Sequence, residues 1–188
     1  MQSYKRLLIS TIIVTRGRLL FVRYFLKIMF KKVKALKDPS DYDHGYQYAL
    51  FLLNLSMRTV AEVREKMAKR GYTTIVINEV INNLLQEKYL NDENYVEVFI
   101  NSMKNYKTWG RFMMKKKMYE KKLPKELIES KLVELVSDED ETEIAERYLQ
   151  REYKDVELKD LAYEDKQKVM RRLLSRGFGM DTVTKLVK

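Results

Sequence analysis

A basic and aromatic cluster between residues 104 and 122 holds the side chains in this sequence that are best suited to binding chemistry. Eight cations there accompany one acidic residue, Glu120. The cations are Lys104, Lys107, Arg111, Lys115, Lys116, Lys117, Lys121 and Lys122, and the interleaved rings are Tyr106, Trp109, Phe112 and Tyr119. Cations bind phosphates, and aromatic rings stack on unpaired bases with about 1–3 kcal/mol each. The cluster therefore predicts a surface for single-stranded nucleic acid.

Two other interpretations of this cluster remain open. The same cations suit an acidic groove on a partner protein, where charge accelerates the encounter. The cluster also suits a solvated helix face whose aromatic side chains belong to the core. We expect Phe112 and Met118 to be core residues under any of these interpretations, whereas Lys115, Lys116 and Lys117 cannot all point inward.

Weaker basic patches occur elsewhere along the chain. Arg171, Arg172 and Arg176 form one, and Arg64, Lys66, Lys69 and Arg70 form another that is mixed with Glu62 and Glu65. Ordinary pairing on helix surfaces accounts for patches of this kind. The candidate interaction residues are Lys104, Lys107, Trp109, Arg111, Lys115, Lys116, Lys117, Lys121, Arg171, Arg172 and Arg176.

Catalytic and metal-binding patterns are not found in the sequence. It has no cysteine and a single histidine, His44, so no Cys–His pair exists for nucleophilic catalysis. His44 lies in a polar segment, where we expect an exposed surface side chain. No glycine-rich phosphate loop is present, and the acidic run 138–141 points its carboxylates in different directions on a helix. We expect a protein that is not an enzyme, with no cofactor, no metal and no small-molecule substrate.

The net charge of +10 is concentrated in the first residues of the chain. Residues 1–37 hold ten basic side chains and no acidic one, which leaves 27 basic and 27 acidic residues in 38–188. A direct nucleic-acid-binding domain is usually basic over one whole face, so the neutral body argues against that alternative. The uncharged run from Leu7 to Thr15 is too short to span a bilayer. A basic helix on a membrane surface stays open as an alternative for this segment.

The composition predicts an all-α fold. Only 6 Gly and 2 Pro are present, there is no Asn-Gly or Asp-Gly turn, and Glu, Lys, Leu and Met recur at helical spacing. Three segments align at offsets of 51 and 55 residues: 59–72, 110–123 and 165–178. Such internal similarity is typical of helical repeats that share a core with their neighbours.

Each aligned position has a physical role. Thr59, Gly110 and Asp165 suit a helix N-cap, and Gly71 and Gly177 suit the left-handed residue that ends a helix, where Lys122 is poorer. The pairs Val63/Met67, Met114/Met118 and Val169/Leu173 put two apolar side chains on one helical face, and Tyr72, Leu123 and Phe178 follow the helix end.

A second helix is expected after each aligned segment. Its apolar positions are Ile77/Ile81, Ile128/Leu132 and Val183/Val187, with Pro124 in a first turn and Asp181 as a cap. A preceding helix is expected near 45–55, 93–104 and 140–153, and Asp92 and the run Ser137-Asp-Glu-Asp140 are expected to supply N-terminal caps and negative charge for two of these helices. Tyr42, Tyr46 and Tyr48 are expected to pack between repeats.

The predicted architecture is three tandem three-helix repeats in an elongated, curved, modular body. Its boundaries are an N-terminal extension at 1–38 and repeats at 39–91, 92–138 and 139–188.

Over residues 44–188 the sequence resembles the RecX family. The pieces that carry the resemblance are Glu62-Val-Arg-Glu-Lys-Met67, Lys69-Arg-Gly-Tyr72, Glu87-Lys-Tyr-Leu-Asn-Asp-Glu-Asn-Tyr95, Phe99, Trp109-Gly-Arg111, Lys121-Lys-Leu-Pro124 and Leu174-Ser-Arg-Gly-Phe178. Their order and spacing carry the resemblance, rather than any single piece. The basic N-terminal segment lies outside the family pattern, and Lys122 replaces the usual glycine of the middle repeat.

The resemblance implies a cytoplasmic bacterial regulator that binds the RecA–single-stranded DNA filament. Family members are expected to hinder its extension in recombination and the SOS response. The expected partners are RecA and, through the filament, single-stranded DNA, with the chain acting as a monomer and without a membrane.

Overall fold

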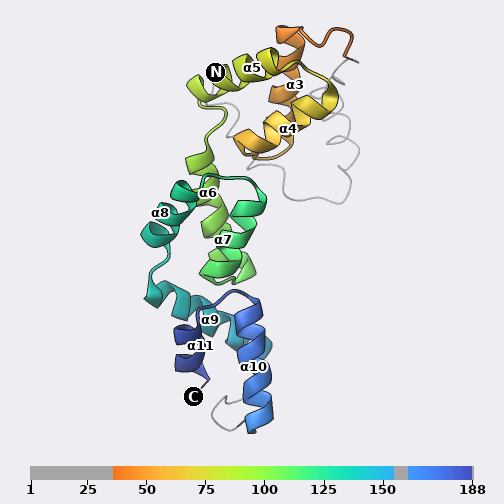
Figure 1. The fold of residues 1–188 in the computed structure, drawn as a ribbon. Coiled ribbons are helices and arrows are strands. Elements are labelled where there is room, and N and C mark those ends of the chain that lie inside the picture. The colour runs from red at the N-terminus through yellow and green to blue at the C-terminus, as the bar shows by residue number, and fades with distance from the viewer. Residues whose placement is uncertain (1–35, 155–160, 188) are drawn as a thin grey trace, which may run out of the picture. The chain divides into compact units, whose positions relative to one another are not determined.

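The computed structural model describes residues 36–154 and 161–187, and every regular element in those ranges is a helix. The predicted N-terminal extension lies outside the described residues, except for its last three. The helices form three successive groups (Figure 1). Their bounds are α3 (Tyr42–Leu55), α4 (Val60–Arg70) and α5 (Thr74–Gln86); α6 (Asp92–Ser102), the π-helix η1 (Met103–Lys107), α7 (Arg111–Glu120) and α8 (Lys125–Leu135); and α9 (Asp138–Glu152), α10 (Tyr163–Ser175) and α11 (Met180–Leu186). The predicted all-α fold of three helical repeats is confirmed.

The N-terminus of α4 is built as its sequence predicts. The Thr59 hydroxyl accepts a hydrogen bond from the backbone N–H of Glu62, and the Glu62 carboxylate accepts one from the N–H of Thr59. This reciprocal pair satisfies two donors that the first turn of a helix leaves free. Ser137 and Asp140 form the same capping box at the start of α9. Gly110 is the N-cap of α7, also as predicted.

The predicted caps in the third repeat are wrong. Helix α10 begins at Tyr163, and the carbonyl of Ala162 accepts hydrogen bonds from the N–H groups of Asp165 and Lys166. Asp165 therefore lies inside the first turn, where its charge complements the helix dipole without capping. Asp181 likewise falls in the first turn of α11, after Gly179 at the N-cap.

Left-handed residues end the three aligned helices as the repeat predicts. Gly71, Lys122 and Gly177 have φ values of 102°, 57° and 85°. Lys122 thus adopts at the middle position a conformation that glycine reaches without strain. The residues that follow, Tyr72, Leu123 and Phe178, are all buried. The turn and the apolar residue after it recur in all three repeats.

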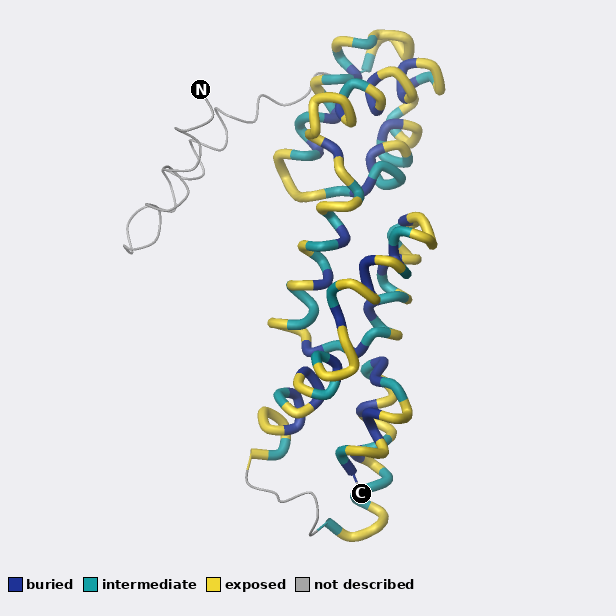
Figure 2. Tube along the Cα trace, turned by 90° about the vertical axis from the view of Figure 1, so that its left-hand side faces the viewer, coloured by how far each residue is buried: buried dark blue, intermediate teal, exposed yellow. Residues whose placement is uncertain are grey.

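The buried residues form two clusters rather than three. Residues of the first repeat make one cluster, around Val63, Met67 and Leu84. A larger cluster joins the second and third repeats and includes Ile100, Met118, Tyr148 and Phe178. Figure 2 shows the buried positions as dark-blue segments that alternate with exposed ones along the helices. The second and third repeats therefore share one core, as expected for helical repeats, whereas the first repeat has a cluster of its own.

Two expectations need correction, one for the first repeat and one for the start of the second. Tyr42, Tyr46 and Tyr48 pack on the cluster of the first repeat itself, not between repeats. The Tyr46 hydroxyl donates to the carboxylate of Glu87, and this hydrogen bond raises the pKa of Tyr46 to about 12. Asp92 is not a cap, because Asn91 caps α6 and the Asp92 carboxylate accepts from the N–H of Val60 at 2.9 Å.

His44 is half-buried and contacts Tyr72, whose hydroxyl lies 2.5 Å from His44 Nδ1. The predicted exposed histidine is therefore wrong. The reason is that His44 sits in the first turn of α3, on the side that faces the buried Tyr72.

Candidate interaction surface

The basic cluster of residues 104–122 lies on two elements and not on one helix. The π-helix η1 ends at Lys107, Thr108 has a φ of 48°, and α7 starts only at Arg111. A π-helix widens the backbone and often occurs at functional positions. The cations therefore divide into those at η1 and those on α7.

Lys104 is engaged inside the protein. Its ammonium group donates to the carboxylate of Asp140 and to the carbonyl of Leu135, both at 2.9 Å, and its side chain is 19% exposed. The hydrogen bond from Lys104, followed by that from the backbone of Ser137, lowers the pKa of Asp140 to about 2. Lys104 thus connects η1 to the start of α9 and is not free for a ligand.

Arg111 is also held by carboxylates of α9. Its backbone N–H donates to Glu141 Oε1 at 2.9 Å, its Nε donates to Glu141 Oε2 at 3.2 Å, and its guanidinium pairs with Asp138. The Glu141 side chain is 3% exposed, so this charge is buried and paired. Hydrogen bonds between a guanidinium and a carboxylate are charge-assisted and are among the stronger polar interactions in proteins. Arg111 therefore joins repeats two and three.

Most cations on α7, and Lys121 just after its end, have a carboxylate partner. Lys115 pairs with Glu129 at 2.8 Å, and Lys117 pairs with Glu120 at 2.8 Å. Lys121 crosses to the first repeat, where it meets Glu62 at 2.6 Å. The side chains of Lys115, Lys117 and Lys121 are each between 37% and 40% exposed. Exposed pairs of this kind are worth about 0–1 kcal/mol, so their cations can still meet a ligand.

Within the basic cluster of residues 104–122, Lys107 and Lys116 are the exposed cations without an ion-pair partner within 4.0 Å among the described residues. Near them in sequence, Tyr106 and Phe112 are 77% and 66% exposed. The expectation that Phe112 is a core residue is therefore wrong, because α7 turns Met114 and Met118 inward. Met118 is buried, as predicted. Trp109 is half-buried and packs on the shared core.

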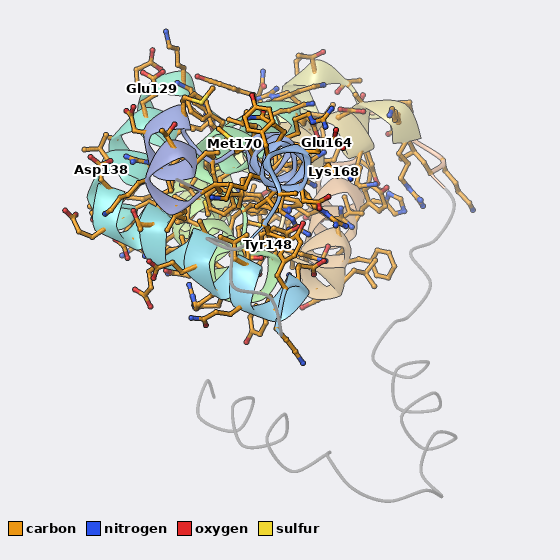
Figure 3. All side chains as sticks on the ribbon, turned by 90° about the horizontal axis from the view of Figure 1, so that it is seen from below. Glu129, Asp138, Tyr148, Glu164, Lys168 and Met170 are labelled. Atoms are coloured by element: carbon orange, nitrogen blue, oxygen red, sulfur yellow. The ribbon has the colours of Figure 1, made fainter. Side chains whose placement is uncertain are left out.

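The C-terminal arginine patch meets the basic cluster. Arg176 Nη1 donates to the carbonyl of Lys107 at 3.0 Å, and its guanidinium lies 4.0 Å from the ring centre of Tyr148. Figure 3 labels Tyr148, which belongs to α9. Arg172 lies 4.0 Å from Glu152, and Arg171 donates to the carbonyl of Gln167. Cations 69 residues apart in sequence thus share one surface.

Two arginines of this surface were missed from the sequence. Arg147 of α9 donates to the carbonyl of Lys104 at 3.2 Å, and Arg151 donates to the Thr108 hydroxyl at 3.3 Å. They are four residues apart and so lie on one helical face. The spacing of Arg147 and Arg151 is visible in the sequence. Acidic residues next to them balance their charge, however, so the segment does not stand out as basic.

The mixed patch on α4 shows ordinary surface pairing, as expected. Lys69 pairs with Glu65 at 2.6 Å, and Arg64 donates to the Asn78 side chain. Lys122 of the second repeat also pairs with Glu65, at 2.9 Å. Hydrogen bonds from Lys69 and Lys122 lower the pKa of Glu65 to about 2. Among the described residues, no helix is both long and apolar enough to cross a membrane.

Three models of one known protein family match the sequence in succession. The first, second and third three-helix domains of RecX match residues 46–84, 91–132 and 138–187. The chain belongs to the RecX family, whose members are regulatory proteins.

Relatives with similar sequences are also RecX regulatory proteins. The regulatory protein RecX of Streptococcus pneumoniae serotype 19F strain G54 is 29% identical over 161 residues, and the protein of strain D39 is equally similar. The match covers 84% of this chain, which in turn spans 61% of the length of those relatives.

Solved structures show the same fold. A crystal structure of RecX from Lactobacillus salivarius has a TM-score of 0.66 and 27% identity, over 81% of this chain and 96% of that one. A second RecX crystal structure also has a TM-score of 0.66, at 16% identity, over 92% of this chain and 79% of the other. The second likeness concerns the fold alone.

Proposed function

We propose that this protein binds the RecA–single-stranded DNA filament and hinders its extension. The observation that carries the proposal is the succession of three RecX domains along one chain. A body of tandem repeats presents a long surface from elements that are distant in sequence. Such a surface can contact more than one subunit of a filament, and occlusion of this kind requires no catalytic group.

The cations at η1, α7 and α10 support a role for charge in that contact. Lys107, Lys116 and Arg171 are exposed, and Arg176 lies beside Lys107. We infer that these side chains meet DNA phosphates or acidic RecA residues in the filament. Lys104 and Arg111 play a different part, since their partners lie within this chain. They hold η1 and α7 in place.

The cellular setting follows from the partner. RecA filaments form on bacterial DNA, so we infer that the protein acts in the cytoplasm, as a monomer and without a cofactor. A direct role as a nucleic-acid-binding module is the competing function. It predicts equal binding to free single-stranded DNA and to the filament.

A titration of the full chain against RecA and single-stranded DNA tests the proposal. RecA hydrolyses ATP on single-stranded DNA, so hydrolysis reports how much filament is present. We expect hydrolysis to fall at amounts of this protein below one per RecA subunit, because blocking a growing end affects many subunits. Unchanged hydrolysis over a wide titration would contradict the proposed inhibition.

A further inference from the structure

A groove lies where the second repeat meets the third. It has a volume of about 680 Å³ and is lined by residues of α7, α8, α9 and α11 with Gly179. Glu129 of α8 and Asp138 of α9 lie on one side of the molecule in Figure 3, beside α11. Glu164 and Lys168 of α10 lie on the opposite side. The groove therefore lies on a different side of the molecule from Glu164 and Lys168 of α10.

Two large apolar side chains stand exposed in this groove. Phe112 and Val133 are 66% and 79% exposed, and Leu132, which also lines the groove, is 5% exposed. The backbone N–H of Phe112 donates to the carbonyl of Gly177 at 3.0 Å, so the position of Phe112 is set by the joint between repeats. An exposed apolar surface rimmed by charge is typical of an interaction site.

Gly179 keeps the groove open beside Phe112. A Cβ atom built at Gly179 would lie 3.6 Å from Glu141 Oε2 and 4.0 Å from Cε2 of Phe112. These are ordinary contact distances, and the φ of Gly179 is −67°, which any residue adopts. A larger side chain at 179 would thus occupy the space between Glu141 and Phe112 without straining the backbone.

The side chains that line the groove carry more negative than positive charge. Five carboxylates line it, from Glu129, Asp138, Glu139, Glu141 and Asp181, together with three cations, from Arg111, Lys115 and Lys185. Arg111 is neutralised by Asp138 and Glu141, and Lys115 by Glu129. Glu139, Asp181 and Lys185 are exposed and have no ion-pair partner among the described residues, so the five carboxylates still exceed the three cations by two. The groove therefore presents negative charge around an apolar centre.

We propose that this groove binds a short segment of a partner protein in which a large apolar residue is flanked by Lys or Arg. The apolar residue packs on Phe112 and Val133, and the flanking cations pair with Glu139 and Asp181. Small-molecule sites are mostly apolar and enclosed. Here eight of the fourteen lining residues are charged, which favours a peptide. The proposal does not depend on RecA binding.

Selection of peptides from a random library displayed on phage, with the full chain immobilised, tests this occupant. We expect the selected sequences to combine a Leu, Ile, Phe or Trp with an adjacent Lys or Arg. A selected peptide is then synthesised with a fluorescent label, and its affinity is measured by polarisation. A selection that yields acidic sequences, or none above background, would overturn the proposal.

Variants of the groove locate the binding site of that peptide. Phe112→Ser, the pair Glu139→Lys with Asp181→Lys, and Gly179→Leu each change a different wall of the groove. Each should weaken binding by about tenfold or more, since central apolar anchors and their charge partners dominate such contacts. The Glu139/Asp181 pair should lose most at low salt, because exposed charges are screened as salt rises.

Matched controls carry the same chemistry outside the groove. Tyr163→Ser removes an aromatic side chain that is 76% exposed on α10. Because Glu143 lies four residues after the groove carboxylate Glu139 on the same helix, the charge-reversal control is placed instead at Glu79, which is exposed on α5 of the first repeat. Tyr163→Ser and Glu79→Lys should both leave peptide affinity unchanged. Folding of every variant is checked by circular dichroism. If the groove variants bind as well as the controls do, the peptide binds elsewhere and the assignment of the groove is wrong.

Discussion

Gly110 and Gly177 bring the backbones of the second and third repeats into direct contact. The N–H of Gly110 donates to the carbonyl of Arg176 at 3.1 Å, and a Cβ atom on Gly110 would lie 2.2 Å from the carbonyl oxygen of Gly177. At the aligned position of the preceding joint, the Thr59 hydroxyl donates to the carbonyl of Lys121 at 3.1 Å. Both joints therefore connect a helix N-cap to the end of a helix in the next repeat.

We expect Gly177→Ala to destabilise the protein by about 2–5 kcal/mol. The left-handed conformation costs a residue with a Cβ about 1–2 kcal/mol. A Cβ at Gly177 would also lie 2.2 Å from the backbone nitrogen of Met113, and overpacking of this kind costs about 1–3 kcal/mol more. Gly110→Ala should show the overpacking cost alone, because its φ is −73°. Urea unfolding measures both.

Gly71→Ala is the matched control for these substitutions. Gly71 has a φ of 102°, but its Cβ would lie 3.5 Å from the nearest atom, which belongs to Leu36. We expect a loss of about 1–2 kcal/mol from conformation alone. A loss at Gly177 no larger than that at Gly71 would contradict the close backbone contact.

Lys122→Gly should stabilise the protein by about 1 kcal/mol. Lys122 adopts a φ of 57°, which glycine reaches without a steric cost. The substitution also removes the exposed pair with Glu65, which is worth about 0–1 kcal/mol and offsets part of the gain. Lys122→Ala isolates the loss of the pair, because it keeps the strain. A destabilised Lys122→Gly variant would mean that the Glu65 pair dominates at this joint.

Acid should weaken the protein as Asp140 becomes protonated. Its folded pKa of about 2 lies below the ordinary 3.8, because Lys104 and the Ser137 backbone bind the charged form. A lowered folded pKa adds stability above the unfolded pKa, and that stability is lost as pH falls through the folded pKa. We expect the thermal midpoint to decline between about pH 4 and pH 2.

Asp140→Asn tests that assignment, since asparagine keeps the shape and can still accept the capping hydrogen bond. The variant should be less stable than the natural chain at neutral pH and should lose less stability between pH 4 and pH 2. Glu65, whose pKa is also about 2, contributes a residual decline in both proteins. Parallel pH profiles for the two proteins would show that the Lys104–Asp140 contact contributes nothing measurable.

Features set by neighbours in sequence could be predicted. The capping box at Thr59 and the left-handed turn at Gly71 depend on residues within four positions, so their pattern is readable. The cap at Asp165 failed because Tyr163 and Glu164 are equally able to start a helix, and only packing decides between them.

Features set by contacts between repeats could not be predicted in this way. Local sequence identifies Lys104, Arg111 and Lys121 as cations, but their partners lie 27 to 59 residues away along the chain. The exposure of Phe112 has a local origin instead, because Met114 and Met118 mark the core side of α7 and Phe112, two positions before Met114, lies on the opposite side of the helix. Sequence therefore located the basic cluster but not the division between structural and exposed cations.

Lys107→Glu combined with Lys116→Glu should weaken binding to the RecA filament. Both cations are exposed and unpaired among the described residues, so reversal changes the surface field without disturbing the fold. If the partners are DNA phosphates, each lost contact should lower the salt dependence by roughly 0.7. If they are RecA carboxylates, affinity for the filament should fall while affinity for free DNA stays the same. Binding at two salt concentrations separates these cases.

Lys125→Glu is the matched control for that pair, because Lys125 is exposed on α8 outside the basic cluster. It should leave filament affinity unchanged. Lys121→Glu differs again, since it breaks the contact with Glu62 and should lower stability as well as binding. Equal affinities for the Lys107/Lys116 variant and the Lys125 control would remove the basic cluster from the interface.

Binding of the full chain to immobilised RecA filaments tests the central claim most directly. The filaments are assembled on single-stranded DNA with a slowly hydrolysed ATP analogue, and the same surface is measured with DNA alone and with RecA alone. We predict saturable binding to the filament that is at least about tenfold tighter than binding to either component, a difference of about 1.4 kcal/mol. Binding to DNA alone that is as tight as binding to the filament, or no binding to the filament, would contradict the account.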